Sequence, residues 1–216
     1  MKTAEQTKND VEQELRWEPS VKAEQIGVSV RNGVVELDGH VASFYEKWGA
    51  EQAALRVANV KSIASEITVD LSSTSARTDA DIALAATSNL NWNYSVPETV
   101  KVKVSDGRVT LSGTTEWQYQ REEAARVIRS LLGVKGVSND IQLKPTVSAA
   151  GVKDKIEVAL KRDAQIDANK ISVEAAGNMV TLRGSVPSWR ERRDAECAAF
   201  SAPGVASVSN LLEISY

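Results

Sequence analysis

The sequence predicts an α+β fold built from three tandem copies of one αββαβ module. Three observations lead to this prediction: a self-match along the chain, a tight-turn dipeptide in each copy, and a regular change between helical and strand spacing of apolar residues. We expect modules at residues 7–69, 78–143 and 148–215. The segments 70–77 and 144–150 are rich in Ser, Thr and Ala and are predicted linkers. In each module a three-stranded mixed sheet should pack against two helices.

The self-match is the strongest of these observations. Residues 11–67 match residues 156–212 without a gap, at a constant offset of 145. The pairs keep their residue type: Leu15 and Leu160, Val28 and Val173, Leu37 and Leu182. The middle copy fits between them, because Gly113 lies 74 residues after Gly39. Its first helix is expected to carry an insertion of three residues near Asn91–Tyr94.

Each module should open with an amphipathic helix. Val11 and Leu15 are four residues apart, which places them on one helical face. A hydroxyl or carboxylate before the first turn can accept its unpaired N–H groups. The residues expected to precede and cap these helices are Thr7 and Asp10 in copy one, and Thr78 and Asp81 in copy two.

Two strands joined by a tight turn should follow. In copy one Ile26, Val28 and Val30 alternate with small or polar residues, which is typical of a half-buried strand. The dipeptides between the two strands tolerate positive φ and favour a hairpin. They are Asn32-Gly33, Asp106-Gly107 and Gly177-Asn178.

A second helix and a last strand complete the module. Ser43 and Glu46 fit the capping box S-x-x-E, and Ser188 and Glu191 repeat it. Copy two has Trp117 and Gln120 at these places, and we expect it to lack the reciprocal cap. The last strand follows a helical crossover and should run parallel to a neighbour. Because a module of this size is marginally stable alone, packing between copies or oligomerisation is expected.

Two motifs recur at fixed places. The second strand ends in V-x-L-x-G, at Val35–Gly39, Val109–Gly113 and Val180–Gly184. The last strand is preceded by GV-x-x-V-x-N, at Gly133–Asn139 and Gly204–Asn210, and copy one departs from it with Asn59–Ser65. Over residues 8–214 the pattern resembles the BON domain, named for bacterial osmotically inducible and nodulation proteins.

The resemblance implies a non-enzymatic protein of the bacterial envelope. BON proteins are typically periplasmic or envelope-associated, and they are linked to osmotic stress, membrane integrity and phospholipid binding. The chain begins without an apolar signal segment, so the sequence as given favours the cytoplasm while the resemblance favours the periplasm.

The residues themselves offer little for chemistry. The chain has one histidine, His40, and one cysteine, Cys197, so we expect no metal site, no cofactor and no catalytic residue. The net charge of −3 argues against nucleic acid as a partner. The repeated glycines are expected to serve the backbone, and the G-x-x-G at Gly133 is interpreted as a turn. These glycines are Gly39, Gly113, Gly184, Gly133 and Gly204.

The aromatic residues give the candidate binding site. A Trp beside Arg at the start of the second helix suits a layer of anionic lipid headgroups. The candidate residues are Trp189, Arg190, Arg192 and Arg193 in copy three, and Trp117, Tyr119 and Arg121 in copy two. The alternative is a partly buried Trp between copies with Arg in solvent. Trp17 and Trp92 end the first helices and are expected to pack in the core or between modules.

Three functions remain open from the sequence. The first is binding of anionic phospholipid or a membrane surface. The second is a soluble structural module that self-associates or binds other proteins, as a chaperone would. The third is a small-ligand pocket between copies, since pockets favour domain interfaces.

Overall fold

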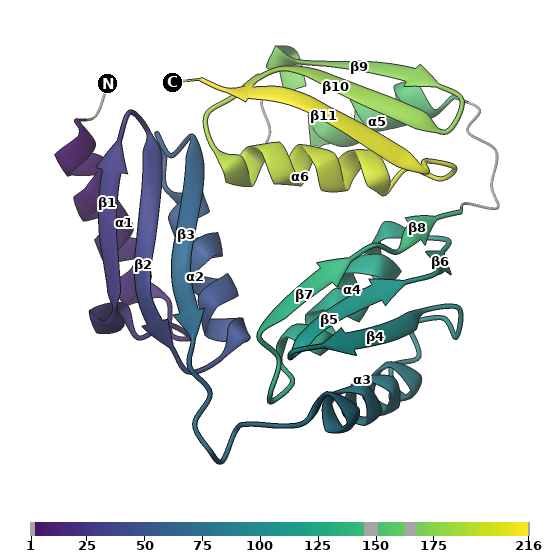
Figure 1. Ribbon diagram of the computed structural model, residues 1–216. Helices are drawn as coiled ribbons and strands as arrows, with labels where there is room; N and C mark the ends of the chain where they lie inside the picture. The colour runs from purple at the N-terminus through teal and green to yellow at the C-terminus, as the bar shows by residue number, and fades with distance from the viewer. Residues whose placement is uncertain (1–2, 145–150, 163–167, 216) are drawn as a thin grey trace. The chain divides into compact units, whose positions relative to one another are not determined.

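A computed structural model describes residues 3–144, 151–162 and 168–215, and it confirms the α+β fold of three αββαβ modules (Figure 1). Each module contains its own three-stranded sheet, in the orders β1-β2-β3, β4-β5-β7 and β9-β10-β11. Each sheet is covered on one face by two helices. The segment 70–77 contains no helix or strand, as expected of a linker, and residues 145–150 of the second predicted linker lie outside the described ranges.

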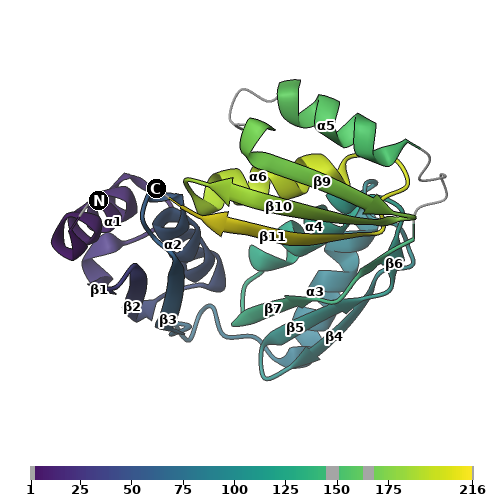
Figure 2. The ribbon, with the colours of Figure 1, turned by 90° about the horizontal axis from the view of Figure 1, so that it is seen from above.

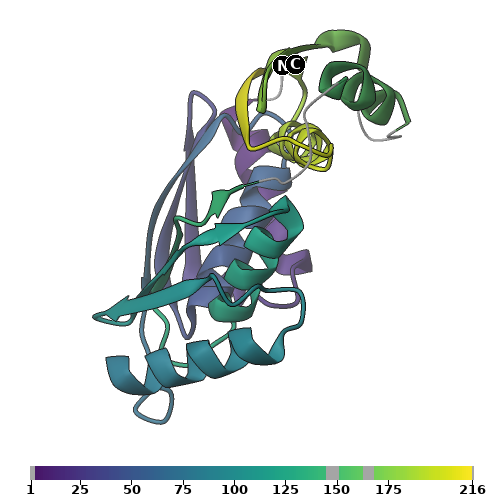
Figure 3. The same ribbon diagram turned by 90° about the vertical axis from the view of Figure 1, so that its right-hand side faces the viewer.

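Module 1 shows the complete pattern. Its elements are α1 (Ala4–Trp17), the 3₁₀ turn η1 (Ala23–Gln25), β1 (Ile26–Arg31), β2 (Val34–Val41), α2 (Phe44–Arg56) and β3 (Ser62–Val69). β1 pairs antiparallel with β2, and β2 pairs parallel with β3. The two helices lie on the same side of the strands (Figure 3). They bury Val11, Leu15, Val35 and Leu37 together with the alanines of α2.

The cap of α1 differs from the sequence prediction. Thr3 is the N-cap, its hydroxyl accepts the N–H of Gln6, and the Gln6 side chain accepts the N–H of Thr3. Thr7 and Asp10 therefore lie inside the helix, and Thr7 is buried beneath its first turn. The prediction failed because both threonines suit a helix start, and only the packing of Thr7 decides between them.

Module 3 repeats module 1 at the predicted offset of 145. Its elements are α5 (Val152–Arg162), η2 (Ala168–Lys170), β9 (Ile171–Ala176), β10 (Met179–Val186), α6 (Trp189–Phe200) and β11 (Ser207–Ile214). β10 lies between β9 and β11 (Figure 2). The buried set of α5 is Val152, Ile156 and Leu160, which correspond to Thr7, Val11 and Leu15.

Module 2 has the same order with a divided last strand. Its elements are α3 (Asp79–Trp92), β4 (Lys101–Ser105), β5 (Arg108–Ser112), β6 (Thr114–Thr115), α4 (Gln118–Arg129), β7 (Gly136–Asn139) and β8 (Gln142–Leu143). β7 pairs parallel with β5, and β8 pairs parallel with β6. Parallel pairing of the last strand after the helical crossover is thus confirmed in modules 1 and 2.

The predicted insertion in module 2 is wrong. Thr3 and Thr78 both cap their helices, and Trp17 and Trp92 both end them, so the helices correspond at an offset of 75. The strands correspond at an offset of 74. Module 2 therefore lacks one residue between helix and sheet, where module 1 has the turn η1. Small residues on a helix can be aligned in more than one register, which is why the sequence comparison misplaced the first helix of module 2.

The second helices are capped in two ways. The Ser43 hydroxyl accepts the N–H of Glu46, and the buried Glu46 carboxylate accepts the N–H groups of Lys22 and Ala42. In module 2 the Gln120 amide oxygen accepts the N–H groups of Glu116 and Trp117. The sequence predicts that module 2 lacks the reciprocal cap, but it keeps the hydrogen bond from the third helical residue and lacks only the hydroxyl.

The repeated glycines have backbone conformations that other residues rarely adopt. Gly39, Gly113 and Gly184 all have φ values between +113° and +135°. A Cβ on any of them would lie about 2 Å from a backbone carbonyl oxygen, which no side chain can do. Gly133 and Gly204 also have positive φ, and Asn59 takes their place in module 1 with φ 71°. Asn tolerates this conformation, which explains how copy one departs from the motif.

Candidate functional site

The candidate residues of module 3 lie on the first two turns of α6. Trp189 is half-buried, and Arg190 and Arg193 are exposed. Arg192 turns toward the last strand, where its guanidinium donates to the carbonyl oxygens of Asn210 at 2.6 Å and Leu212 at 3.1 Å. Arg190 and Arg193 are thus exposed, and Arg192 ties α6 to β11.

The candidate residues of module 2 occupy the equivalent turns of α4 but are arranged differently. Trp117 is the N-cap residue and corresponds to Ser188, so it does not match Trp189 in position. Tyr119 is exposed, and Arg121 is half-buried. The Trp and Arg side chains of the two modules therefore do not form a repeated site.

The end of the first helix carries a repeated feature that the sequence interpretation missed. Trp17 and Trp92 occupy equivalent positions and are 84% and 88% exposed, so the expectation that they pack in the core is wrong. Tyr94, two residues after Trp92, is 99% exposed. Aligning the two helices at the offset of 75 shows that Trp17 and Trp92 each lie two positions after the last buried residue of their helix, which places them off its buried face.

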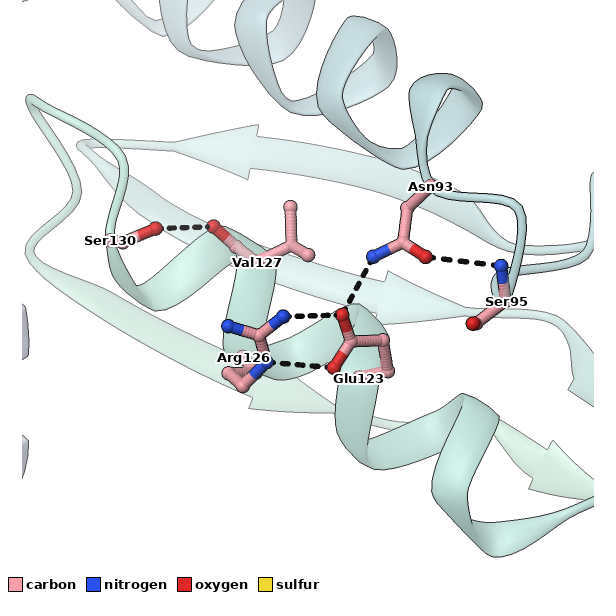
Figure 4. Close-up of polar contacts among 6 residues, drawn as sticks. All are labelled: Asn93, Ser95, Glu123, Arg126, Val127 and Ser130. Atoms are coloured by element: carbon pink, nitrogen blue, oxygen red, sulfur yellow. Dashed lines mark hydrogen bonds and ion pairs between the residues drawn. The ribbon is translucent and has the colours of Figure 1, made fainter.

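In module 2 the exposed aromatic residues lie on a segment that is fixed to α4. The Asn93 side chain donates to Glu123 at 2.7 Å and accepts the backbone N–H of Ser95 at 3.0 Å (Figure 4). Glu123 also receives two hydrogen bonds from Arg126, and these hold its pKa below the ordinary value. Because Asn93 points inward, its neighbours Trp92 and Tyr94 are directed to the surface.

Module 1 fixes the same segment with an ion-pair network. Arg56 of α2 donates to Glu14 and to Glu18, each at 2.8 Å, and Ser20 donates to Glu18 at 2.9 Å. The hydrogen bond from Arg56 lowers the pKa of Glu18. Module 1 is also acidic overall, with twelve Asp and Glu against seven Lys and Arg in residues 3–70. Trp17 therefore projects from a module of net negative charge.

Around Trp92 the surface is neutral and more apolar. The positions of Glu14 and Glu18 are taken by Asn89 and Asn93 in module 2. Leu84, about two turns before Trp92 on α3, is also more than half exposed. In residues 78–145 eight acidic residues balance eight basic ones. Exposed Trp, Tyr and Leu in such surroundings are typical of a surface that meets an apolar phase or a partner.

The two residues considered for nucleophilic chemistry belong to different modules. His40 is exposed, and its Nδ1 lies 2.8 Å from the carboxylate of Asp70, the residue after β3. Cys197 is half-buried in α6, where burial raises its pKa to about 11 and keeps it as the thiol. Within the described ranges no group of three or more His, Cys, Asp and Glu side chains could hold a metal ion. None of the helices in those ranges is long and apolar enough to span a bilayer.

One family model matches nearly the whole chain, and two known proteins match parts of it. The family model of the BON domain matches residues 3–70, 78–145 and 148–216. Osmotically-inducible protein Y of Escherichia coli is 30% identical over 122 residues, which are 53% of this chain and 61% of that protein. An uncharacterized protein of Anaplasma centrale is 26% identical over 145 residues, or 64% of this chain and 95% of that protein.

Solved structures resemble the chain only slightly. The C-terminal domain of CdsD, a structural protein of the type III secretion system of Chlamydia trachomatis, is 15% identical over 96% of both chains, with a TM-score of 0.28. That likeness is too small to bear on function. The family assignment rests instead on three matches that each cover one αββαβ module. The chain belongs to the BON domain family, with three tandem domains.

Proposed function

We propose that this chain is a non-enzymatic stress protein of the bacterial envelope that binds the surface of membranes containing anionic phospholipid. The similarity to osmotically-inducible protein Y supports the link to osmotic stress, although the chain spans only 61% of that protein's length. The observation that carries the proposal is the exposure of Trp92 and Tyr94 on a fixed, neutral surface of module 2.

Trp and Tyr are the side chains that favour the boundary between headgroups and acyl chains, because each has an apolar ring and a polar edge. Trp92 and Tyr94 flank Asn93, whose side chain is held by Glu123. The two rings are therefore presented without the entropy cost of ordering a loose loop. The apolar contribution to membrane binding is assigned to these residues.

The anionic contribution is assigned to α6. Arg190 and Arg193 are exposed on its first two turns beside the half-buried Trp189. A basic side chain near an anionic bilayer contributes about 1 kcal/mol, and the contribution is screened by salt. Arg192 is left out of this surface because its guanidinium is bound to the carbonyl groups of β11.

Co-sedimentation with vesicles tests the two contributions separately. The unaltered chain is compared on vesicles with and without phosphatidylglycerol, at low and high salt. Arg190→Ala with Arg193→Ala should remove the preference for anionic vesicles, while Trp92→Ala with Tyr94→Ala should weaken binding to both. No binding of the unaltered chain to anionic vesicles at low salt would contradict the proposal and favour a protein-binding or self-associating module.

A further inference from the structure

The last strand of each sheet is an edge strand, and its outward backbone groups are open to pairing with another strand. In module 2 the N–H groups of Asp140, Gln142 and Lys144 donate to the neighbouring strand. The alternate residues Asn139 and Ile141 therefore direct their N–H and C=O groups away from the sheet. The corresponding outward pairs are Ser65 and Ile67 in module 1, and Asn210 and Leu212 in module 3.

In module 3 side chains occupy these outward groups. Arg192 donates from Nη2 to the Asn210 carbonyl and from Nε to the Leu212 carbonyl. The Asn210 side chain accepts the N–H of Leu212 at 3.3 Å. Its amide nitrogen donates to the Arg192 carbonyl at 3.0 Å and to Glu196 at 2.9 Å, which fixes the side chain against α6. We call Arg192 and Asn210 the edge lock.

The other two modules each have half of this lock. In module 2 Asn139 accepts the N–H of Ile141 and donates to the Arg121 carbonyl, but no bond joins the Arg121 side chain to the last strand. In module 1 Lys47, the equivalent of Arg192, donates to the Ile67 carbonyl at 2.7 Å. Ser65 takes the place of Asn there, and its hydroxyl is buried without a hydrogen-bond partner.

The two long last strands carry a basic donor on their outward carbonyls, and the divided one does not. β3 and β11 are unbroken strands of eight residues, and the last strand of module 2 is divided into pieces of four and two. Short or interrupted edges pair poorly, whereas a long edge needs explicit protection. We propose that Arg192 and Asn210 prevent β11 from adding a strand of a second copy of this chain, and that losing them lets two copies associate through β11.

The basic residue at positions 47 and 192 thus has a role beyond joining helix to strand. Capping a carbonyl by a charged donor makes that carbonyl unavailable to an incoming N–H, and the incoming strand would have to displace the guanidinium from two bonds at once. The Arg192 fork covers two consecutive outward carbonyls, while the Lys47 ammonium covers one. The occupant excluded is a strand, which needs those same backbone groups.

The test uses a double variant that carries both Arg192→Met and Asn210→Ser. Sedimentation velocity compares it with the unaltered chain over a wide range of concentration. Arg193→Met, which removes an exposed charge one residue away, is the matched control. The double variant should dimerise at least about tenfold more tightly than the unaltered chain, and the control should not. A double variant that is folded and associates no more than the control overturns the proposal.

Hydrogen exchange separates edge pairing from loss of fold. In the associated double variant the amides of Asn210, Leu212 and Ile214, which point outward, should gain protection as concentration rises. Association without that gain overturns the proposal. If the double variant loses the fold of module 3, the single variant Asn210→Ser decides, because module 1 folds with Ser at the equivalent position. The single variant should show the same gain in protection, but a smaller one. No gain in protection in the single variant overturns the proposal.

Discussion

Modules 1 and 2 present an exposed Trp at the same position on the same helix but give it opposite surroundings. Trp17 projects beside Glu14 and Glu18, which are held by Arg56 on an acidic module. Trp92 projects beside Tyr94 from a neutral module, where Asn93 and Glu123 hold the segment. Because the fold positions both rings alike, the difference in charge and apolar neighbours decides what each can bind.

The largest effect should appear in membrane binding. Replacing Trp92 and Tyr94 by Ala should weaken binding to phosphatidylglycerol vesicles about tenfold, since two interfacial aromatic side chains are lost. Trp17→Ala should change it by less than about twofold, because module 1 carries a net negative charge that an anionic surface repels. Vesicle titration measures both, and equal losses would show that the charge around the ring is irrelevant.

A smaller effect should appear in the stability of the two anchors. Arg56→Met removes two ion pairs that join α1 and α2, and it should lower the free energy of opening of module 1 by about 1 kcal/mol after allowance for solvent screening. Arg126→Met in module 2 removes a more exposed pair within one helix and should cost less than about 0.5 kcal/mol. Native-state hydrogen exchange reports each module separately; a larger loss in module 2 would contradict this ranking.

The motif Asn should stabilise module 1 when restored. Ser65→Asn places an amide where Asn139 and Asn210 bond the helix carbonyl and the outward N–H of the strand. It also removes a buried hydroxyl without a partner, and the gain should be about 0.5 kcal/mol. Amide exchange of β3 measures it, with Ser62→Asn on the exposed face as control. Faster exchange in Ser65→Asn would mean that module 1 has no space for the amide.

The smallest effect concerns pH. Glu18 has a folded-state pKa below its ordinary value of 4.5 because Arg56 donates to it. Its contribution to stability is therefore present above pH 4.5 and is lost as the pH falls through the lowered pKa. The difference between the unaltered chain and Arg56→Met should shrink on acidification below 4.5. A difference that grows there would place the stabilising contact elsewhere.

The fold was predictable from the sequence because its signals are local and occur three times. The hairpin dipeptides, the V-x-L-x-G glycines and the alternation of apolar residues each depend on a few neighbouring positions. The helix starts were harder, since Thr3 and Thr7 are both good caps and only the burial of Thr7 separates them. The residue missing between α3 and β4 also misled the alignment, because small residues on a helix carry little positional information.

The candidate site was less predictable, because side-chain direction depends on tertiary packing. Arg190, Arg192 and Arg193 are alike in sequence, and only the position of β11 shows that Arg192 is bound to backbone carbonyls. The exposure of Trp92 depends on the inward hydrogen bonds of Asn93, which join residues 30 positions apart. A Trp in a sequence is usually assigned to the core, and the only local sign against that assignment is its position two residues after the buried stripe.

The central claim is that Trp92 enters the membrane interface. The most direct test is the fluorescence of a chain that keeps Trp92 alone, with Trp17, Trp48, Trp117 and Trp189 replaced by Phe, titrated with phosphatidylglycerol vesicles. A matched chain that keeps Trp17 alone is the control. The account predicts a blue shift and quenching by brominated lipid for Trp92, and little change for Trp17. Binding of the chain to the vesicles with the Trp92 emission unchanged would contradict it.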